Sequence, residues 1–210
     1  MPVRTSLADR VAILLDGGFV RKKLRRQLNR PAIAADIVKV CTDLMAKDRL
    51  KEADLFRIFY YDSEPYEGKA TNPMSRATIN FGASTVALDG RRLLSTLELQ
   101  PDIAVRRGIV LCHGWKLGNT ALKQLGTTPR PINAGDLVPD MKQKGIDIRI
   151  GLDIARLALK EIVEIVVLVT GDSDFVPVMK FARTEGLKVY LEPMGHSVRT
   201  ELRVHADFVF

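Results

Sequence analysis

The feature that most constrains this chain is a short apolar segment that ends in two aspartates. Residues 163–177 read V-E-I-V-V-L-V-T-G-D-S-D-F-V-P. The uninterrupted apolar run at 165–169 is typical of a strand buried on both faces of a parallel sheet. Asp172 and Asp174 follow it, and we expect a helix to begin directly after them. Sites in open α/β folds form outside the carboxyl ends of such strands, so we expect both carboxylates at one sheet edge.

A second segment near the N-terminus has the same arrangement. Residues 11–15 form another apolar run rich in branched side chains, and D-G-G follows at 16–18. Residues 19–28 then predict an amphipathic helix. Its polar face is basic and includes Arg21, Lys22 and Arg25. This face is either a solvated helix surface or, because it lies beside Asp16, a surface that contacts phosphate.

The rest of the chain alternates between strand-like and helix-like patterns. Strands are expected at 54–61, 103–112 and 187–191, and helices at 36–47, 74–99, 147–160, 174–185 and 197–205. Residues 115–140 have no clear period and contain several prolines and glycines, which predicts a long mobile loop able to cover a substrate. We therefore expect a three-layer α/β/α, Rossmann-like domain with a mostly parallel central sheet. It would be a single domain over 8–210, with an inserted helical and loop region at about 63–139.

Charge and cysteine content narrow the class of protein. The chain has 32 Lys and Arg against 25 Asp and Glu, a net charge of +7. This excess fits nucleic acid as a partner, and equally a soluble protein with a basic surface. Cys41 and Cys112 have the spacing of neither a disulfide framework nor a zinc site. No apolar stretch approaches the roughly 18 residues of a membrane span. Residues 1–10 show no signal-peptide pattern, so we expect a cytoplasmic protein without a membrane partner.

Aspartates provide the candidate site. Asp16, Asp172 and Asp174 follow two predicted strands, while Asp147 and Asp153 belong to one predicted helix, which Asp147 is expected to cap. A single aspartate after a strand is most often a turn former or helix cap. Carboxylates gathered in one cleft, however, repel one another unless a cation neutralises them. Oxygen ligands without His or Cys suit Mg²⁺ or Mn²⁺, ions that support phosphoryl transfer. Phosphate-loop, dinucleotide-binding, serine-hydrolase and zinc-protease motifs are absent.

Four short motifs follow one another along the chain: D-G-G-F at 16–19, K-G-I-D at 144–147, T-G-D-S-D-F-V-P at 170–177 and L-x-x-x-A-D-F at 202–208. In this order they resemble the motifs of the NYN domain family, in particular its LabA-like branch within the PIN-like nuclease superfamily. The resemblance implies a PIN-like fold and a divalent-metal-dependent ribonuclease site. The metal-binding acids that it implies are Asp16, Asp147, Asp153, Asp172 and Asp174. Phe19 is a departure, because many family members have Asn at this position.

The sequence therefore predicts a metal-dependent endoribonuclease. The five aspartates would serve as catalytic residues and metal ligands, and a water activated by Mg²⁺ or Mn²⁺ would hydrolyse RNA phosphodiesters. RNA contacts are expected at Arg21, Lys22, Arg25, Lys144 and Ser173. The alternatives are a non-catalytic RNA- or protein-binding regulatory module with the same fold, and a phosphatase or nucleotide hydrolase.

Some features stay open at this point. His196 is either a surface histidine or a phosphate contact. Phe19 and Trp115 either pack in a core or stack on a base. A homodimer is left open.

Overall fold

The computed structural model describes residues 8–210; residues 1–7, which belong to the segment without a signal-peptide pattern, lie outside the described part. The strands are β1 (Arg10–Asp16), β2 (Asp54–Ser63), β3 (Lys69–Thr71), β4 (Thr78–Asn80), β5 (Ile103–Leu117), β6 (Leu137–Lys144), β7 (Ile165–Val169), β8 (Lys188–Glu192) and β9 (Phe208–Val209). The helices are α1 (Gly17–Leu28), α2 (Ala34–Met45), α3 (Thr85–Glu98), α4 (Asn119–Thr127), α5 (Ile146–Leu159), α6 (Val176–Thr184) and α7 (Thr200–Val204), with 3-10 turns η1 (Ala134–Asp136) and η2 (Ser173–Phe175).

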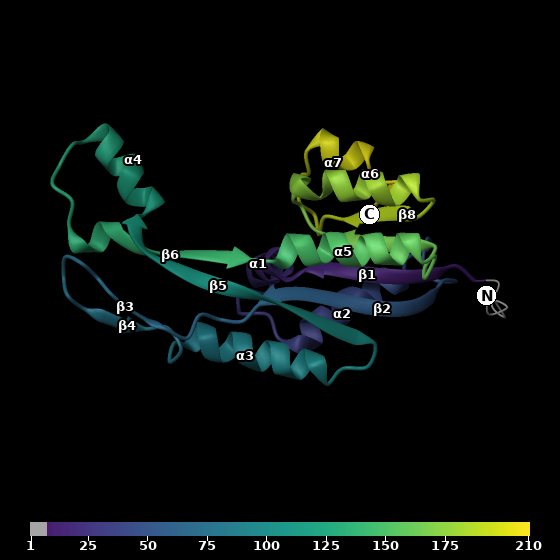
Figure 1. The fold of residues 1–210 in the computed structure, drawn as a ribbon, viewed down its shortest axis with the longest axis horizontal. Helices are drawn as coiled ribbons and strands as arrows, with labels where there is room; N and C mark the ends of the chain where they lie inside the picture. The colour runs from purple at the N-terminus through teal and green to yellow at the C-terminus, as the bar shows by residue number, and fades with distance from the viewer. Residues whose placement is uncertain (1–7) are drawn as a thin grey trace. The chain divides into compact units, whose positions relative to one another are not determined.

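A mostly parallel sheet is the framework of the fold (Figure 1). Its strand order is β6-β5-β2-β1-β7-β8-β9, and β3 and β4 form a separate two-stranded sheet. The pairs β1–β2, β1–β7, β7–β8 and β8–β9 are parallel, whereas β5 and β6 are antiparallel. This confirms the predicted α/β architecture.

The chain divides into two units, which are described separately. The first comprises 8–62, 93–107 and 145–210 of the described chain, and the second comprises 63–92 and 108–144. The second overlaps the region that the sequence predicts as an insertion. Within residues 8–210, no helix combines the length and apolar character needed to cross a bilayer.

The core of the first unit is built on β1. Residues 11–15 are completely buried, and alternate side chains point into two apolar layers. Val11, Ile13 and Leu15 pack with α1, α2 and the end of α3. Ala12 and Leu14 pack with α5 and α6, which cover the opposite face. Fully burying one such aliphatic side chain contributes about 1.5–3 kcal/mol, so β1 fixes the positions of the neighbouring strands and helices.

The prediction of a long mobile loop at 115–140 is wrong. β5 continues to Leu117, α4 follows, and β6 returns antiparallel to β5 in a register from Ile109 opposite Lys144 to Leu117 opposite Leu137. Cross-strand hydrogen bonds hold such a ribbon without an uninterrupted apolar run, and a register shift between Cys112 and Trp115 breaks its period. Likewise, β3 and β4 occupy part of the region predicted as loop and helix, and α3 begins only at Thr85.

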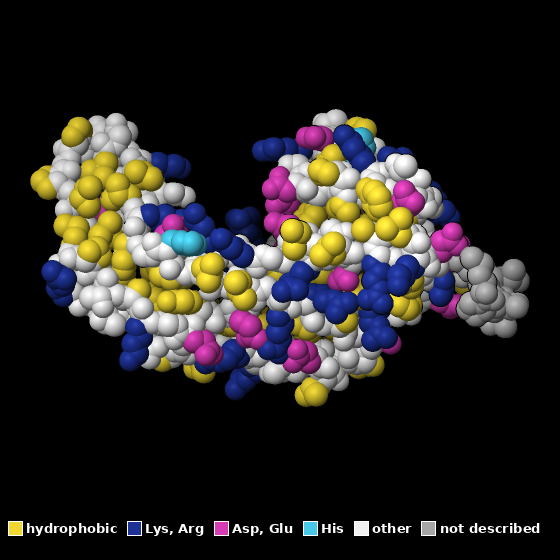
Figure 2. Space-filling view, viewed as in Figure 1, with side chains coloured by type: hydrophobic (Ala, Val, Ile, Leu, Met, Phe, Trp, Pro, Cys, Tyr) yellow, Lys and Arg dark blue, Asp and Glu magenta, His cyan; other side chains and the backbone are white. Residues whose placement is uncertain are grey.

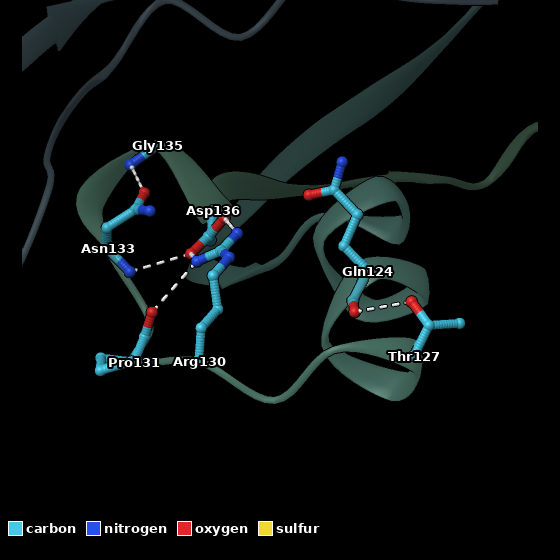
Figure 3. Close-up of polar contacts among 7 residues, drawn as sticks. All are labelled: Gln124, Thr127, Arg130, Pro131, Asn133, Gly135 and Asp136. Carbon is cyan, nitrogen blue, oxygen red and sulfur yellow. Dashed lines mark hydrogen bonds and ion pairs between the residues drawn. The ribbon is translucent and has the colours of Figure 1, made fainter.

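One ion pair organises the segment between α4 and β6 in the second unit (Figure 3). The Arg130 guanidinium donates two hydrogen bonds to the Asp136 carboxylate, at 2.7 and 2.6 Å. The Asn133 backbone N–H donates a third, at 2.8 Å. The guanidinium and this N–H together lower the pKa of Asp136 to about 2. These hydrogen bonds therefore hold residues 130–136, part of the expected mobile loop, in a defined turn.

Low pH should weaken the hydrogen bonds that hold this turn, because it protonates Asp136. Because the pKa of Asp136 is lower in the folded state, the pair stabilises the segment above about pH 4, and the stabilisation is lost as the pH falls towards 2. We predict that Asp136→Asn accelerates pepsin cleavage within 128–137 at pH 4, and that the difference from the unmodified chain disappears near pH 2. Asp43→Asn, which removes an exposed ion pair on α2, is the control. Equal cleavage of both variants at pH 4 would contradict the role of the pair.

Gly17 permits a close approach of α1 to β2. A Cβ at this position would lie 2.5 Å from the carbonyl oxygen of Tyr61 and 2.9 Å from Cβ of Asp62. We predict that Gly17→Ala lowers the free energy of unfolding by roughly 1–3 kcal/mol in urea denaturation, because backbone must shift.

Gly151 in α5 is the matched control, because a Cβ there meets no atom within 4 Å. Gly151→Ala should leave the protein as stable or raise the free energy of unfolding by up to about 1 kcal/mol through helix propensity. If Gly17→Ala and Gly151→Ala have the same midpoint of urea denaturation, the close approach at Gly17 does not contribute to stability.

Candidate acidic site

The site begins with Asp16, the last residue of β1. Leu15 pairs with Val169 of β7, so the parallel register places Asp16 next to Thr170 at the carboxyl edge. The Asp16 carboxylate accepts the Phe19 backbone N–H at 3.1 Å and thereby caps α1. It also accepts the Thr170 hydroxyl at 3.2 Å. These two donors fix the orientation of the carboxylate.

Thr170 connects this carboxylate to the second acidic segment. Its side chain is completely buried, and its hydroxyl oxygen accepts the Asp172 backbone N–H at 3.2 Å while donating to Asp16. The Asp172 carboxylate then accepts the Asp174 backbone N–H at 3.0 Å, which caps η2. One hydroxyl therefore sets the positions of both strand ends.

The acidic side chains interact electrostatically. Burial is the main cause that raises the pKa of Asp16, and the charges of Asp147 and Asp172 raise it further, against the two hydrogen bonds. Burial also raises the pKa of Asp147, followed by the charges of Asp172 and Asp174. Asp147 lies in the first turn of α5, where Gly145, rather than Asp147 as predicted, is the N-cap residue. Four of the five predicted acids are therefore close enough to interact electrostatically: Asp16, Asp147, Asp172 and Asp174.

A cavity of about 490 Å³ opens at this edge of the first unit. Asp16 and Asp172 line it together with Phe19, Lys22 and Arg199. The cavity thus combines carboxylates, cationic side chains and an aromatic ring.

The fifth acid is held elsewhere. Asp153 accepts hydrogen bonds from Arg106 at 2.9 and 3.4 Å and from the Tyr61 hydroxyl at 2.9 Å. It lines a different cavity, between β2, β5 and α5. The sequence placed Asp153 correctly in the same helix as Asp147, but it could not show that Arg106 pairs with the carboxylate.

Comparison with known proteins identifies the family. The NYN domain family matches residues 79–210, more than half of the chain. The chain belongs to the NYN domain family. NYN domains are nuclease-type, PIN-like domains, and the matched part contains every candidate acid except Asp16.

A solved structure supports the fold. The crystal structure of a protein of unknown function from Vibrio parahaemolyticus resembles this NYN protein with a TM-score of 0.52 at 15% identity, over 99% of this chain and 94% of that chain. At this identity the likeness concerns the fold alone. No curated protein matches the chain significantly.

The predicted RNA-contacting residues of this NYN protein lie in different surroundings. Lys22 and Ser173 line the acidic cavity. Arg21 instead pairs with the buried Asp62, with Nε 2.7 Å from the carboxylate. Arg25 is exposed on α1, and Lys144 is exposed at the end of β6 in the second unit.

Two cavity residues were missed or undervalued. Arg199 precedes α7 and lines the cavity, as does His196, whose ring lies 6.0 Å from that of Phe19. Both follow the carboxyl end of β8, which is parallel to β7. The sequence could have indicated both residues by their position, because side chains that follow neighbouring parallel strands lie at the same edge of the sheet.

The Thr170 hydroxyl provides a test of the site's construction. We predict that Thr170→Val lowers the free energy of unfolding by about 1–3 kcal/mol, because the Asp16 carboxylate and the Asp172 N–H lose their partner. Thr170→Ser retains the hydroxyl and should lose less. Chemical denaturation measures both, and a valine variant at least as stable as the serine variant would contradict the role of the hydroxyl.

Proposed function

We propose that this protein is a divalent-metal-dependent endoribonuclease of the LabA-like NYN branch. The observation that carries the proposal is the cavity in which Asp16 and Asp172 face the same space as Lys22 and Arg199. Carboxylates suit a cation, and the cationic side chains suit a phosphodiester. Membership of a nuclease-type family supports this substrate class.

The chemistry of the donor set fits Mg²⁺ or Mn²⁺. Asp16, Asp147, Asp172 and Asp174 offer only oxygen ligands. Burial, followed by the charges of neighbouring carboxylates, raises the pKa of Asp16 and Asp147. Within residues 8–210, no three His, Cys, Asp or Glu side chains form a group that could hold a metal. We propose that Asp16 and Asp172 hold the cation and that Asp147 and Asp174 turn towards it. Asp153 would join them only by releasing Arg106.

The chain's own groups have distinct parts in the proposed reaction. A bound divalent ion supplies a water of lowered pKa and neutralises phosphate charge. The Phe19 N–H and Thr170 hydroxyl keep the Asp16 carboxylate in one orientation. Lys22 and Arg199 bind phosphate oxygens at the rim, and the Phe19 ring contacts a base.

A second candidate function is a non-catalytic RNA-binding module. The pairing of Asp153 with Arg106 favours it, because this aspartate is one of the acids that the family resemblance assigns to the metal. RNA binding without cleavage at any divalent ion concentration would support this candidate.

Asp172→Asn tests the catalytic proposal. The amide keeps an oxygen that can accept the Asp174 N–H but lacks the charge needed to hold the cation. We predict a loss of Mn²⁺-dependent cleavage of single-stranded RNA of at least about a hundredfold, because charge stabilisation typically contributes this much. The unfolding midpoint should change little.

Glu185→Gln is the matched control, because it removes a charge from an exposed side chain after the end of α6. Its cleavage rate should equal that of the unmodified protein. Full Mn²⁺-dependent activity in folded Asp172→Asn protein would refute the assignment.

A further inference from the structure

The first unit contains a second cavity that the proposed reaction does not use. It has a volume of about 270 Å³ and lies between β2, β5 and the C-terminal half of α5. Its lining includes Phe56, Arg57, Phe59, Arg106, Arg156 and Ile162. Figure 2 shows Lys and Arg side chains gathered in front of α5 and β2, with apolar side chains between them. The cavity is therefore cationic at its rim and apolar inside.

Arg106 is the fixed element of this cavity. Its guanidinium lies 5.2 Å from the centroid of the buried Phe59 ring, a cation–π contact. Asp153 holds it at 2.9 Å, and the Tyr61 hydroxyl holds Asp153 in turn. This chain of contacts fixes a planar cationic group before any ligand arrives, so little entropy is lost on binding.

Arg57 and Arg156 form the rim. Both are exposed, and their side chains have no ion-pair or hydrogen-bond partner among residues 8–210. Elsewhere in the chain, arginines such as Arg30, Arg130 and Arg183 are paired with aspartates. Unpaired guanidinium groups beside an apolar cavity favour an anionic ligand that also has an apolar or planar part.

We propose that this cavity binds one nucleotide unit, with the base against the Arg106 guanidinium and the phosphate between Arg57 and Arg156. Bases stack on arginine planes as they do on aromatic rings, and guanidinium groups bind phosphate in bidentate fashion. A free nucleoside monophosphate and a nucleotide within an RNA strand have this chemistry in common. That the unit belongs to the substrate RNA rests on the proposed function.

The position along α5 connects the two cavities. Asp147 and Arg156 are nine residues apart on this helix, which corresponds to about 13 Å at 1.5 Å per residue. Nine residues also make about two and a half turns, so the two side chains project from opposite sides of α5. An RNA strand that occupies both cavities would therefore pass around α5.

Binding of a fluorescent 8-nucleotide RNA in EDTA measures this site without cleavage. Arg57→Glu and Arg156→Glu should each raise the Kd by about tenfold, because each reverses a charge at the phosphate. Arg203→Glu, the same change at an exposed arginine on α7, is the control and should change the Kd less than threefold. Equal effects in all three variants would overturn the proposal, since they would reflect net charge alone.

Competition identifies the bound unit. Displacement of the RNA by AMP or UMP, lost in Arg156→Glu, would support a site that also takes free nucleotides. If neither AMP nor UMP competes, but Arg57→Glu and Arg156→Glu still weaken RNA binding, the cavity recognises a nucleotide only within a strand. A glutamate-rich peptide with the same charge as the RNA serves as a competitor without bases. If it displaces the fluorescent RNA as well as unlabelled RNA does, the base has no role in binding.

The result separates this proposal from the nuclease assignment. If the protein cleaves RNA, and Arg57→Glu and Arg156→Glu bind RNA as well as the unmodified protein does, only the nucleotide site is overturned. Arginine-dependent binding without cleavage would support the nucleotide site and refute the nuclease.

Discussion

The parallel register between β1 and β7 is the constraint on which the site depends. Because Leu15 lies opposite Val169, the next residues, Asp16 and Thr170, meet at the sheet edge. The buried Thr170 hydroxyl then joins the Asp16 carboxylate to the Asp172 backbone. A shift of one residue in this register would turn Asp16 to the other face of the sheet and separate these groups.

The same arrangement has an electrostatic cost that points to function. Burial and neighbouring carboxylates raise the pKa of Asp16 and Asp147, so the folded protein holds negative charge at an edge where it is unfavourable. A divalent cation would relieve this repulsion, and Lys22 and Arg199 would then attract a phosphodiester to the same cavity. Asp153, by contrast, is neutralised by Arg106 and supports a different surface. The structure therefore separates the five acids into two groups with different chemistry.

The sequence was sufficient for the parts of the fold that depend on burial. The apolar runs of β1 and β7 and the aspartates that follow them predicted the sheet edge, because buried parallel strands require such runs. Most of β5 was predicted, but the end of β5 and the whole of β6 were missed, because their pairing is held by backbone hydrogen bonds that no side-chain period reveals. The partners of Asp153 and Arg21 could not be predicted for a related reason: Arg106 and Asp62 are 47 and 41 residues away in sequence.

A crystal of the protein soaked in Mn²⁺ would show whether the carboxylates at this sheet edge bind a metal ion. We predict an anomalous difference peak coordinated by Asp16 and Asp172, with Asp147 and Asp174 turned towards it, while Asp153 stays paired with Arg106. A map without a peak between Asp16 and Asp172 at millimolar Mn²⁺ would refute the proposed metal site.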